Sequence, residues 1–333
     1  MIGWKSKISE MGKASSKLAI FGCKLAITCG CFWYLFRQID VGELLRDAVN
    51  LDYRWFAFAA FTIFSQMPLV ALRWSWITNA LEPNRPAVPF RPMFAITMIA
   101  NFLVQILPNV MGDALRVWML AKIRTGWTKG LIGVVIDRGV GIGALLAIGF
   151  VTFLNASTFT AFAGFRQSLL LLFGALLLAA ATGLLCARFF APILTRYRAT
   201  RWISEVMLAS RHVLLESPAA ISIVAVAFVV HFLSIAAIWE LGRAFALAFT
   251  VVEAAVLFTL MVAAMLVPVS VSGWGLREMM VTAFLTAHGL PAQRALLFSI
   301  SFGLTLTAAS TPGAILMMFY SPANARRSHS HTA

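Results

Sequence analysis

The sequence predicts an all-α polytopic membrane protein, and three observations support that prediction. Hydrophobic residues make up 60% of the 333 residues and charged residues 12%, about half the charged share of a typical soluble domain. Six windows approach or exceed the roughly 20 apolar residues that a helix needs to cross a bilayer. Two shorter apolar segments are interrupted by proline and glycine, which indicates two re-entrant helical hairpins beside the six full spans.

The six windows define the full spans in their order along the chain. They cover Leu18–Phe36, Trp55–Leu72, Leu131–Phe153, Ser168–Phe190, Ala219–Trp239 and Ala295–Phe319. With the two hairpins they give eight hydrophobic segments in one transmembrane domain, residues 18–320. A basic segment, residues 1–17, precedes this domain, and a polar tail, residues 321–333, follows it. We expect the first window to be an uncleaved anchor, because it is longer than the apolar region of an ordinary signal peptide.

The basic residues predict the orientation of the spans. The net charge is +14, and with the N-terminus inside, most of the 27 Lys and Arg residues fall in inside segments. This asymmetry follows the positive-inside rule, so both termini are predicted to be cytoplasmic in an inner (plasma) membrane. We therefore expect the positive charge to orient the spans and to attract anionic headgroups of the cytoplasmic leaflet. Nucleic acid is not an expected partner.

One cytoplasmic segment, residues 195–217, has the pattern of an amphipathic helix. Its apolar face and its arginines would suit a helix lying on the membrane surface, although a solvated connector is the alternative. The apolar face is formed by Ile203, Val206, Met207, Ser210 and Leu214. The cysteines and histidines have no metal-ligand spacing, so neither a metal site nor a cofactor is expected.

The two interrupted segments resemble each other. Leu107-Pro108, Gly112-Asp113 and Leu115-Arg116 align with Val267-Pro268, Gly273-Trp274 and Leu276-Arg277, with one extra residue in the second copy. The predicted repeats cover about residues 55–155 and 219–320. Three full crossings lie between the two broken segments, so the copies are inverted: the first hairpin enters from the cytoplasm and the second from outside.

Broken helices inside a membrane need a polar environment, because unpaired backbone groups in hydrocarbon cost several kcal/mol each. We interpret the turns as hinges whose following helices offer free N–H groups to an anion. The turn residues are Pro108, Gly112, Pro268, Gly273 and Gly275. Arg116 and Arg277 are the candidate phosphate ligands, and Asp113 and Glu278 would orient them. In the alternative interpretation, Asp113 caps the second half-helix beside a paired or snorkelling Arg116, and Arg277–Glu278 is an interfacial pair.

A third charged patch lies early in the span that begins at Leu131. Asp137 and Arg138 either face the same cavity or neutralise each other at its cytoplasmic rim. Glycines 139, 141 and 143 would allow a neighbouring helix to approach closely. Three further polar residues are expected in structural places: Arg73 snorkelling or touching a headgroup, His231 hydrogen-bonded in the core, and Glu240 at the outer interface.

These motifs resemble the lysylphosphatidylglycerol synthase transmembrane-region family, also called the flippase-like domain. The resemblance rests on "LPNVMGDALR", "IDRGVGIGALL", "VPVSVSGWGLRE" and "ALRWSWITNAL" and covers nearly the whole chain. It implies an inverted repeat with two re-entrant hairpins and movement of anionic or aminoacylated lipids between leaflets, with relatives that handle hopanoid or isoprenoid lipids. The family usually carries paired glycines where Met111 and Ser272 stand, and a glutamate where Asp137 stands. Aminoacyl transfer belongs to a separate soluble domain of larger members and is not expected here.

We therefore expect a lipid translocator without catalytic residues. A cationic cavity would accept the headgroup of a phospholipid or isoprenoid lipid while its chains stay in the bilayer. Two alternatives stay open: an integral-membrane transferase acting on a polyprenyl-phosphate lipid, and an accessory subunit of a lipid or hopanoid biosynthesis complex. The expected protein partner is a second copy of the chain, in a homodimer, or a lipid-synthesis enzyme.

Overall fold

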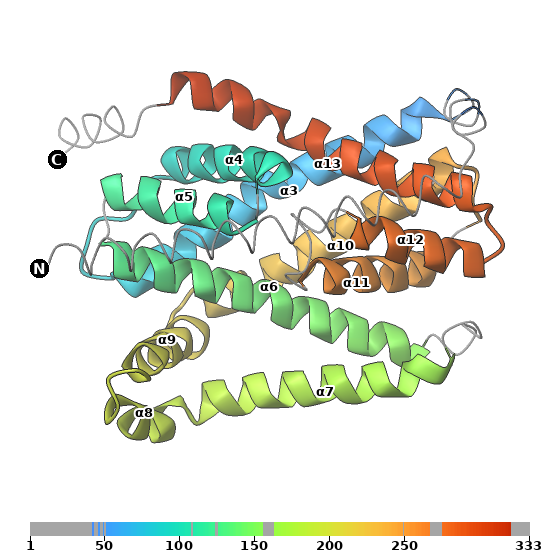
Figure 1. Ribbon diagram of the computed structural model, residues 1–333. Helices are drawn as coiled ribbons and strands as arrows, with labels where there is room; N and C mark the ends of the chain where they lie inside the picture. The colour runs from blue at the N-terminus through green and yellow to red at the C-terminus, as the bar shows by residue number, and fades with distance from the viewer. Residues whose placement is uncertain are drawn as a thin grey trace, which may run out of the picture. The chain divides into compact units, whose positions relative to one another are not determined.

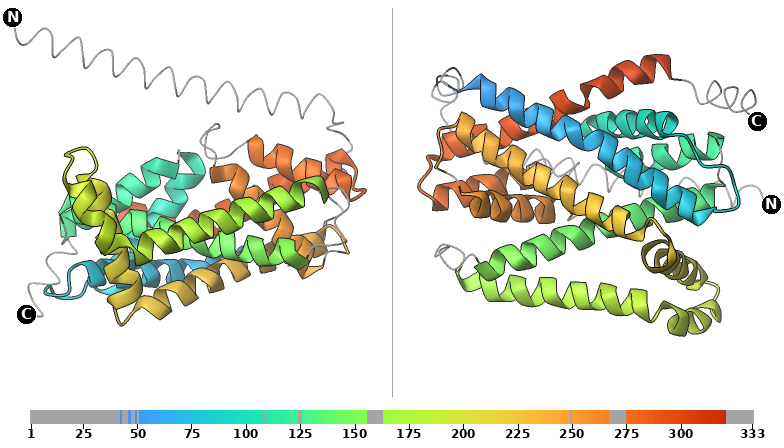
Figure 2. Two further views of the ribbon diagram at one scale, coloured as in Figure 1. Left: turned by 90° about the horizontal axis from the view of Figure 1, so that it is seen from below. Right: turned by 180° about the vertical axis from the view of Figure 1, so that it is seen from behind.

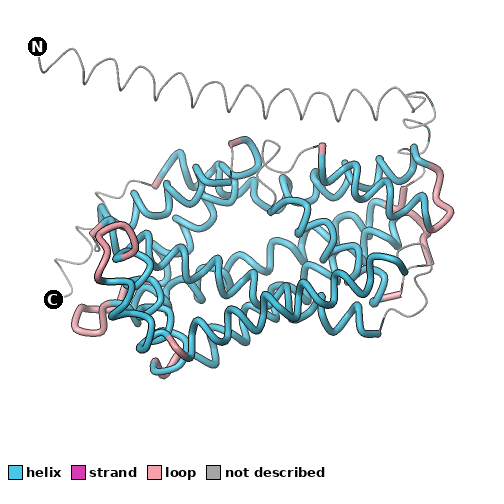
Figure 3. Tube along the Cα trace, turned by 60° about the horizontal axis from the view of Figure 1, so that its bottom comes forward, coloured by secondary structure: helices cyan, strands magenta, loops and turns pink. Residues whose placement is uncertain are grey.

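The computed structural model describes residues 42, 46, 49, 51–107, 109–123, 126–155, 163–248, 250–266 and 275–320. Throughout these ranges the regular secondary structure is helical, without a strand (Figure 3). The predicted all-α class is thus confirmed for the part of the chain that the structure describes.

Five helices in the described ranges are long and apolar enough to cross a membrane. They are α3 (Tyr53–Leu81), α6 (Trp127–Asn155), α7 (Ala163–Leu185), α10 (Ala220–Ala244) and α13 (Ala292–Phe319). They correspond to five of the six predicted spans, and the remaining one, residues 18–36, lies outside the described residues. The predicted end of α7 at Phe190 is wrong, because the helix stops at Leu185 and Phe190 belongs to the next helix, α8 (Ala187–Thr195).

Four shorter helices occupy the two interrupted segments. The first segment holds α4 (Phe90–Ile106) and α5 (Asn109–Ile123), and the second holds α11 (Val251–Leu266) and α12 (Leu276–Ala287). At 17, 15, 16 and 12 residues each would extend about 18–26 Å, less than the roughly 30 Å of a hydrocarbon core. A long helix precedes and follows each short pair, so the order of helix lengths is the same in both predicted repeats.

The chain divides into two compact units. The larger comprises Asp52–Thr259 and Phe302–Ala333, and the smaller comprises Met1–Leu51 and Leu260–Ser301. Within the larger unit, α3 and α10 run antiparallel side by side (Figure 2). At one end of this pair the Asp52 N–H donates to the Ala244 carbonyl at 3.2 Å, and near the other Ile77 packs in a cluster with Ile223.

The α4–α5 hairpin packs against the C-terminal half of α3 and the N-terminal half of α6 (Figure 1). Their shared core contains Trp74, Met93, Ile96, Val117, Leu120 and Val134. Gly112 lies where α5 touches α4: a Cβ added there would be 2.3 Å from Val104 Cγ2 and 3.1 Å from the Ala100 carbonyl oxygen. Gly112 therefore lies inside α5, and its small size permits the close contact of the two helices.

The predicted amphipathic segment is two helical pieces. It contains α9 (Arg201–Arg211) and the π-helical turn η2 (His212–Glu216), while residues 196–200 connect α8 to α9. Val206 and Leu214 of the predicted apolar face pack beside the buried Val213, whereas Ile203 is exposed. Part of the predicted apolar face therefore packs against other helices of the protein.

A cluster of polar contacts joins η2 to the end of α7. The Glu216 carboxylate accepts hydrogen bonds from the side chains of Arg188 at 2.8 Å and His212 at 3.3 Å, and lies 3.2 Å from Arg211. The bond from His212, helped by the charges of Arg188 and Arg211, lowers the pKa of Glu216 from its usual value. The Arg211 guanidinium also donates to the Leu185 carbonyl at 2.8 Å, which closes the end of α7.

The close contact at Gly112 leads to a test of the hairpin packing. We expect Gly112→Ala to lower the thermal unfolding temperature of the purified protein, because overpacking of a tight contact costs about 1–3 kcal/mol. Gly139→Ala is the matched control, since no described atom lies within 4 Å of a Cβ added at Gly139. Unfolding followed by intrinsic fluorescence in detergent measures both variants, and equal unfolding temperatures would contradict the close packing of α4 and α5.

Candidate functional site

A buried carboxylate on α6 organises the charged residues of the larger unit. Asp137 is 2% exposed and carries two arginines, one on each carboxylate oxygen. Arg73 of α3 donates from Nε to Oδ1 at 2.8 Å, and Arg116 of α5 donates from Nη1 to Oδ2 at 3.1 Å. A single side chain of α6 thus ties together α3 and α5, which lie far apart in sequence.

A second carboxylate forms the outer part of the same cluster. Asp113 of α5 accepts two hydrogen bonds from Arg138, from Nε at 2.9 Å and from Nη2 at 2.8 Å. It also lies 3.7 Å from Arg116 Nη1, three residues further along the same helix face. The Arg138 side chain is 53% exposed, so this pair marks the accessible side of the cluster.

The charges in this cluster do not balance. Among the described residues, Arg73, Arg116 and Arg138 face two carboxylates, Asp113 and Asp137, which leaves a surplus of one positive charge. Arg116 is 5% exposed and its Cζ lies 4.2 Å from the centre of the Trp74 ring. Two of its nitrogens, Nε and Nη2, have no hydrogen-bond partner among the described residues. Because a buried donor without an acceptor is costly, an added hydrogen-bond acceptor at these two nitrogens would be stabilising.

The smaller unit holds the other predicted pair in a different arrangement. Glu278, at the start of α12, accepts the Gly275 N–H on Oε2 at 2.6 Å and the Arg277 guanidinium on Oε1, with Nε at 2.9 Å. Ser299 Oγ lies 3.5 Å from the same Oε1. Gly275 has φ +84°, a conformation that favours glycine. Glu278 therefore both closes the first turn of α12 and neutralises Arg277, and both residues are buried within the protein.

Several expectations about single residues are corrected. Asp113 does not cap the second half-helix, because α5 already begins at Asn109. Asp137 and Arg138 do not neutralise each other, since each pairs with a residue of another helix. Arg73 does not snorkel and is buried. Among the described residues, no atom would touch an added Cβ at 139, 141 or 143, although His231 of α10 reaches the Gly141 carbonyl.

The remaining predicted residues have less direct roles. His231 Nε2 donates to the Gly141 carbonyl at 2.8 Å, as expected for a hydrogen-bonded packing residue, and Glu240 accepts from Thr62 at 3.1 Å. Of the turn residues, Gly112 and Gly275 are described, whereas Pro108, Pro268 and Gly273 lie outside the described residues. Within the described ranges, no three His, Cys, Asp or Glu side chains gather in a set that could hold a metal ion.

Arg73 and Trp74 have larger roles than their sequence context predicts. Both lie in the C-terminal half of α3, in a setting of arginine beside aromatic residues that is typical of interfacial anchoring. The available signal was the "ALRWSWITNAL" resemblance, which groups Arg73 with the other motifs. In the structure Arg73 holds Asp137 and Trp74 supports Arg116.

The fold and the buried charges define an integral multi-pass membrane protein. The model of the lysylphosphatidylglycerol synthase TM region matches residues 22–313. The chain therefore belongs to this lipid-related family, and the match covers nearly all of it. No matching relative was found among curated proteins, and no matching fold was found among solved structures.

Because Asp137 forms two buried ion pairs, we expect the uncharged variant Asp137→Asn to be less stable. Asp137→Asn would remove the carboxylate that Arg73 pairs with and leave the buried Arg116 with only the more distant Asp113, at 3.7 Å. Breaking a buried ion pair by removing one partner costs about 3–5 kcal/mol. We expect a clear loss of thermal stability in detergent. Glu205→Gln is the control, because Glu205 forms only an exposed pair with Arg201 on α9. An Asp137→Asn protein as stable as the control variant would contradict the central place of Asp137.

Proposed function

We propose that the chain moves a phosphate-containing phospholipid or isoprenoid lipid between membrane leaflets. The observation that supports this proposal most is the buried cationic cluster, with its surplus positive charge and the two unpartnered nitrogens of Arg116. A buried charge in a membrane segment costs roughly 2.5–3.5 kcal/mol on insertion scales, so the buried Arg73, Arg116 and Asp137 need a compensating role. Transient binding of an anionic headgroup supplies such a role.

In this proposal the residues of the cluster have different tasks. Asp137 and Arg73 hold Arg116 in place, and Arg116 offers its free nitrogens to the phosphate. Arg138, on the exposed side, exchanges its ion pair with Asp113 for one with the phosphate of the incoming headgroup. Guanidinium groups suit this task because their planar donors match two phosphate oxygens at once.

We infer alternating access from the two short helix pairs. If they are re-entrant and inverted, as the order of helix lengths and the charge distribution suggest, each would open a path to one side of the membrane. The lipid chains would stay in the bilayer while the headgroup crosses. The proposed place of action is the inner (plasma) membrane, with both termini cytoplasmic.

A transferase is less well supported. General-base catalysis needs a carboxylate that is free to accept a proton. Asp113, Asp137 and Glu278 each accept hydrogen bonds from arginine instead. We therefore propose no catalytic step.

Lipid exchange in proteoliposomes tests the proposal. Fluorescent phosphatidylglycerol, phosphatidylethanolamine and a polyprenyl phosphate are each followed by quenching of the outer-leaflet label. We expect the wild-type protein to accelerate exchange of at least one of them. Arg116→Gln should slow this exchange by about tenfold or more, the equivalent of losing one good charged contact.

The matched control is Arg201→Gln, which removes a surface arginine from α9. It should exchange lipid at the wild-type rate. Wild-type vesicles that are no faster than protein-free vesicles for all three lipids would overturn the proposed function.

A further inference from the structure

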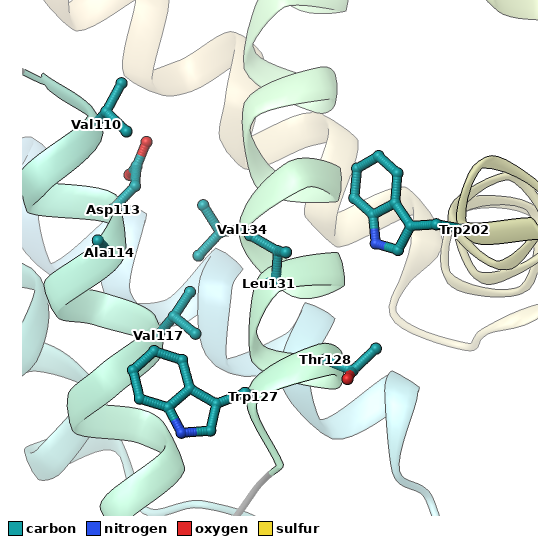
Figure 4. A pocket seen from close by; sticks show the side chains of 9 residues that line it. All are labelled: Val110, Asp113, Ala114, Val117, Trp127, Thr128, Leu131, Val134 and Trp202. Atoms are coloured by element: carbon teal, nitrogen blue, oxygen red, sulfur yellow. The ribbon is translucent and has the colours of Figure 1, made fainter. Parts of the chain in front are cut away.

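An apolar groove runs beside the charged cluster of the larger unit. It has a volume of about 460 Å³, within the usual range of small-molecule sites of about 300–1,000 Å³. Residues of α5, the first two turns of α6, and Trp202 of α9 line it (Figure 4). The lining residues are Val110, Asp113, Ala114, Val117, Trp127, Thr128, Leu131, Val134 and Trp202.

The groove has one strongly polar position. Among the described residues that line it, Asp113 is the single charged one, and the Asp113 carboxylate binds the exposed Arg138. Asp113 also lies 3.7 Å from Arg116, whose Nε and Nη2 are buried without a described partner. The apolar groove therefore borders the cationic cluster at Asp113.

The lining chemistry limits what the groove can hold. Apart from Asp113 and Thr128, its lining side chains are apolar or aromatic. An extended peptide or a sugar would leave many hydrogen-bonding groups without partners there. A hydrocarbon chain has no such groups, and a charged headgroup on the same molecule would meet the arginines. Trp127 and Trp202, both substantially exposed, suit the boundary between hydrocarbon and headgroups.

We propose that this groove binds one hydrocarbon chain of a phosphate-headed lipid, with the phosphate at the Asp113–Arg138 end. The proposal rests on the proposed function and names the path by which the lipid enters. The phosphate displaces Asp113 from Arg138 and lies within reach of Arg116, while the chain replaces surrounding lipid against Leu131 and Val134.

Photo-crosslinking of the full-length protein in nanodiscs tests this site. The probes carry a diazirine in one acyl chain and are phosphatidylglycerol, phosphatidylethanolamine and, as a phosphate-free reference, diacylglycerol. We expect the two phospholipid probes, or one of them, to label peptides containing Val117, Leu131 or Val134. Diacylglycerol should label them about tenfold less, because it lacks the charged contact.

Three variants separate the groove from general lipid contact. Ala114→Trp and Thr128→Trp fill the groove from α5 and α6, and each should reduce labelling by about tenfold. Ala180→Trp adds the same side chain on the exposed surface of α7 and should leave labelling unchanged. Two filling variants are used so that a folding defect in one, detected by its unfolding temperature, leaves the other informative.

The proposal is overturned if the filled variants label like the wild type, or if diacylglycerol labels the groove as strongly as the phospholipids. Labelling spread evenly over the groove and the exposed face of α7 would also overturn it, since this indicates surrounding bilayer lipid only. If the wild-type groove is not labelled while proteoliposomes still exchange lipid, the groove proposal is wrong and the proposed function stands. If the groove is labelled specifically but no lipid is exchanged, the groove proposal stands and the proposed function is wrong.

Discussion

The structure of the larger unit depends on one buried interaction, the pairing of Asp137 with both Arg73 and Arg116. Each group alone would be expensive to bury, and together they satisfy each other only in one geometry. That geometry ties the C-terminal half of α3 and helix α5 to the N-terminal half of α6. The interaction therefore sets the fold and positions the candidate site at the same time.

The other residues of the cluster surround the buried Asp137, Arg73 and Arg116. Trp74 covers one face of Arg116, and Gly112 lets α5 lie close against α4. The three-residue spacing of Asp113 and Arg116 places both on the same face of α5. Asp113 then holds Arg138 at the accessible edge, beside the apolar groove. A fully buried charge is thus linked to an exposed one through residues of two helices, an arrangement suited to an anion on an apolar chain.

Much of the architecture could be predicted from sequence, because apolar length determines which segments can span a bilayer. The partners of the charged residues could not. Asp137 and Arg138 are adjacent in sequence, but consecutive side chains point about 100° apart on a helix, so they contact different helices. Arg73 looked like an interfacial anchor because its partner lies 64 residues away. Long-range pairing of this kind leaves no local pattern in the sequence. The three-residue spacing of Asp113 and Arg116 is such a pattern, so their proximity could be predicted.

The central claim is that Asp137 holds Arg116 so that its free nitrogens bind a lipid phosphate. Native mass spectrometry of the purified protein measures this directly, as the phospholipid retained after mild detergent removal. The account predicts a retained phosphate-containing lipid on the wild-type protein and its loss in Arg116→Gln, with Arg201→Gln unchanged. Equal retention by the wild type and Arg116→Gln would contradict the account.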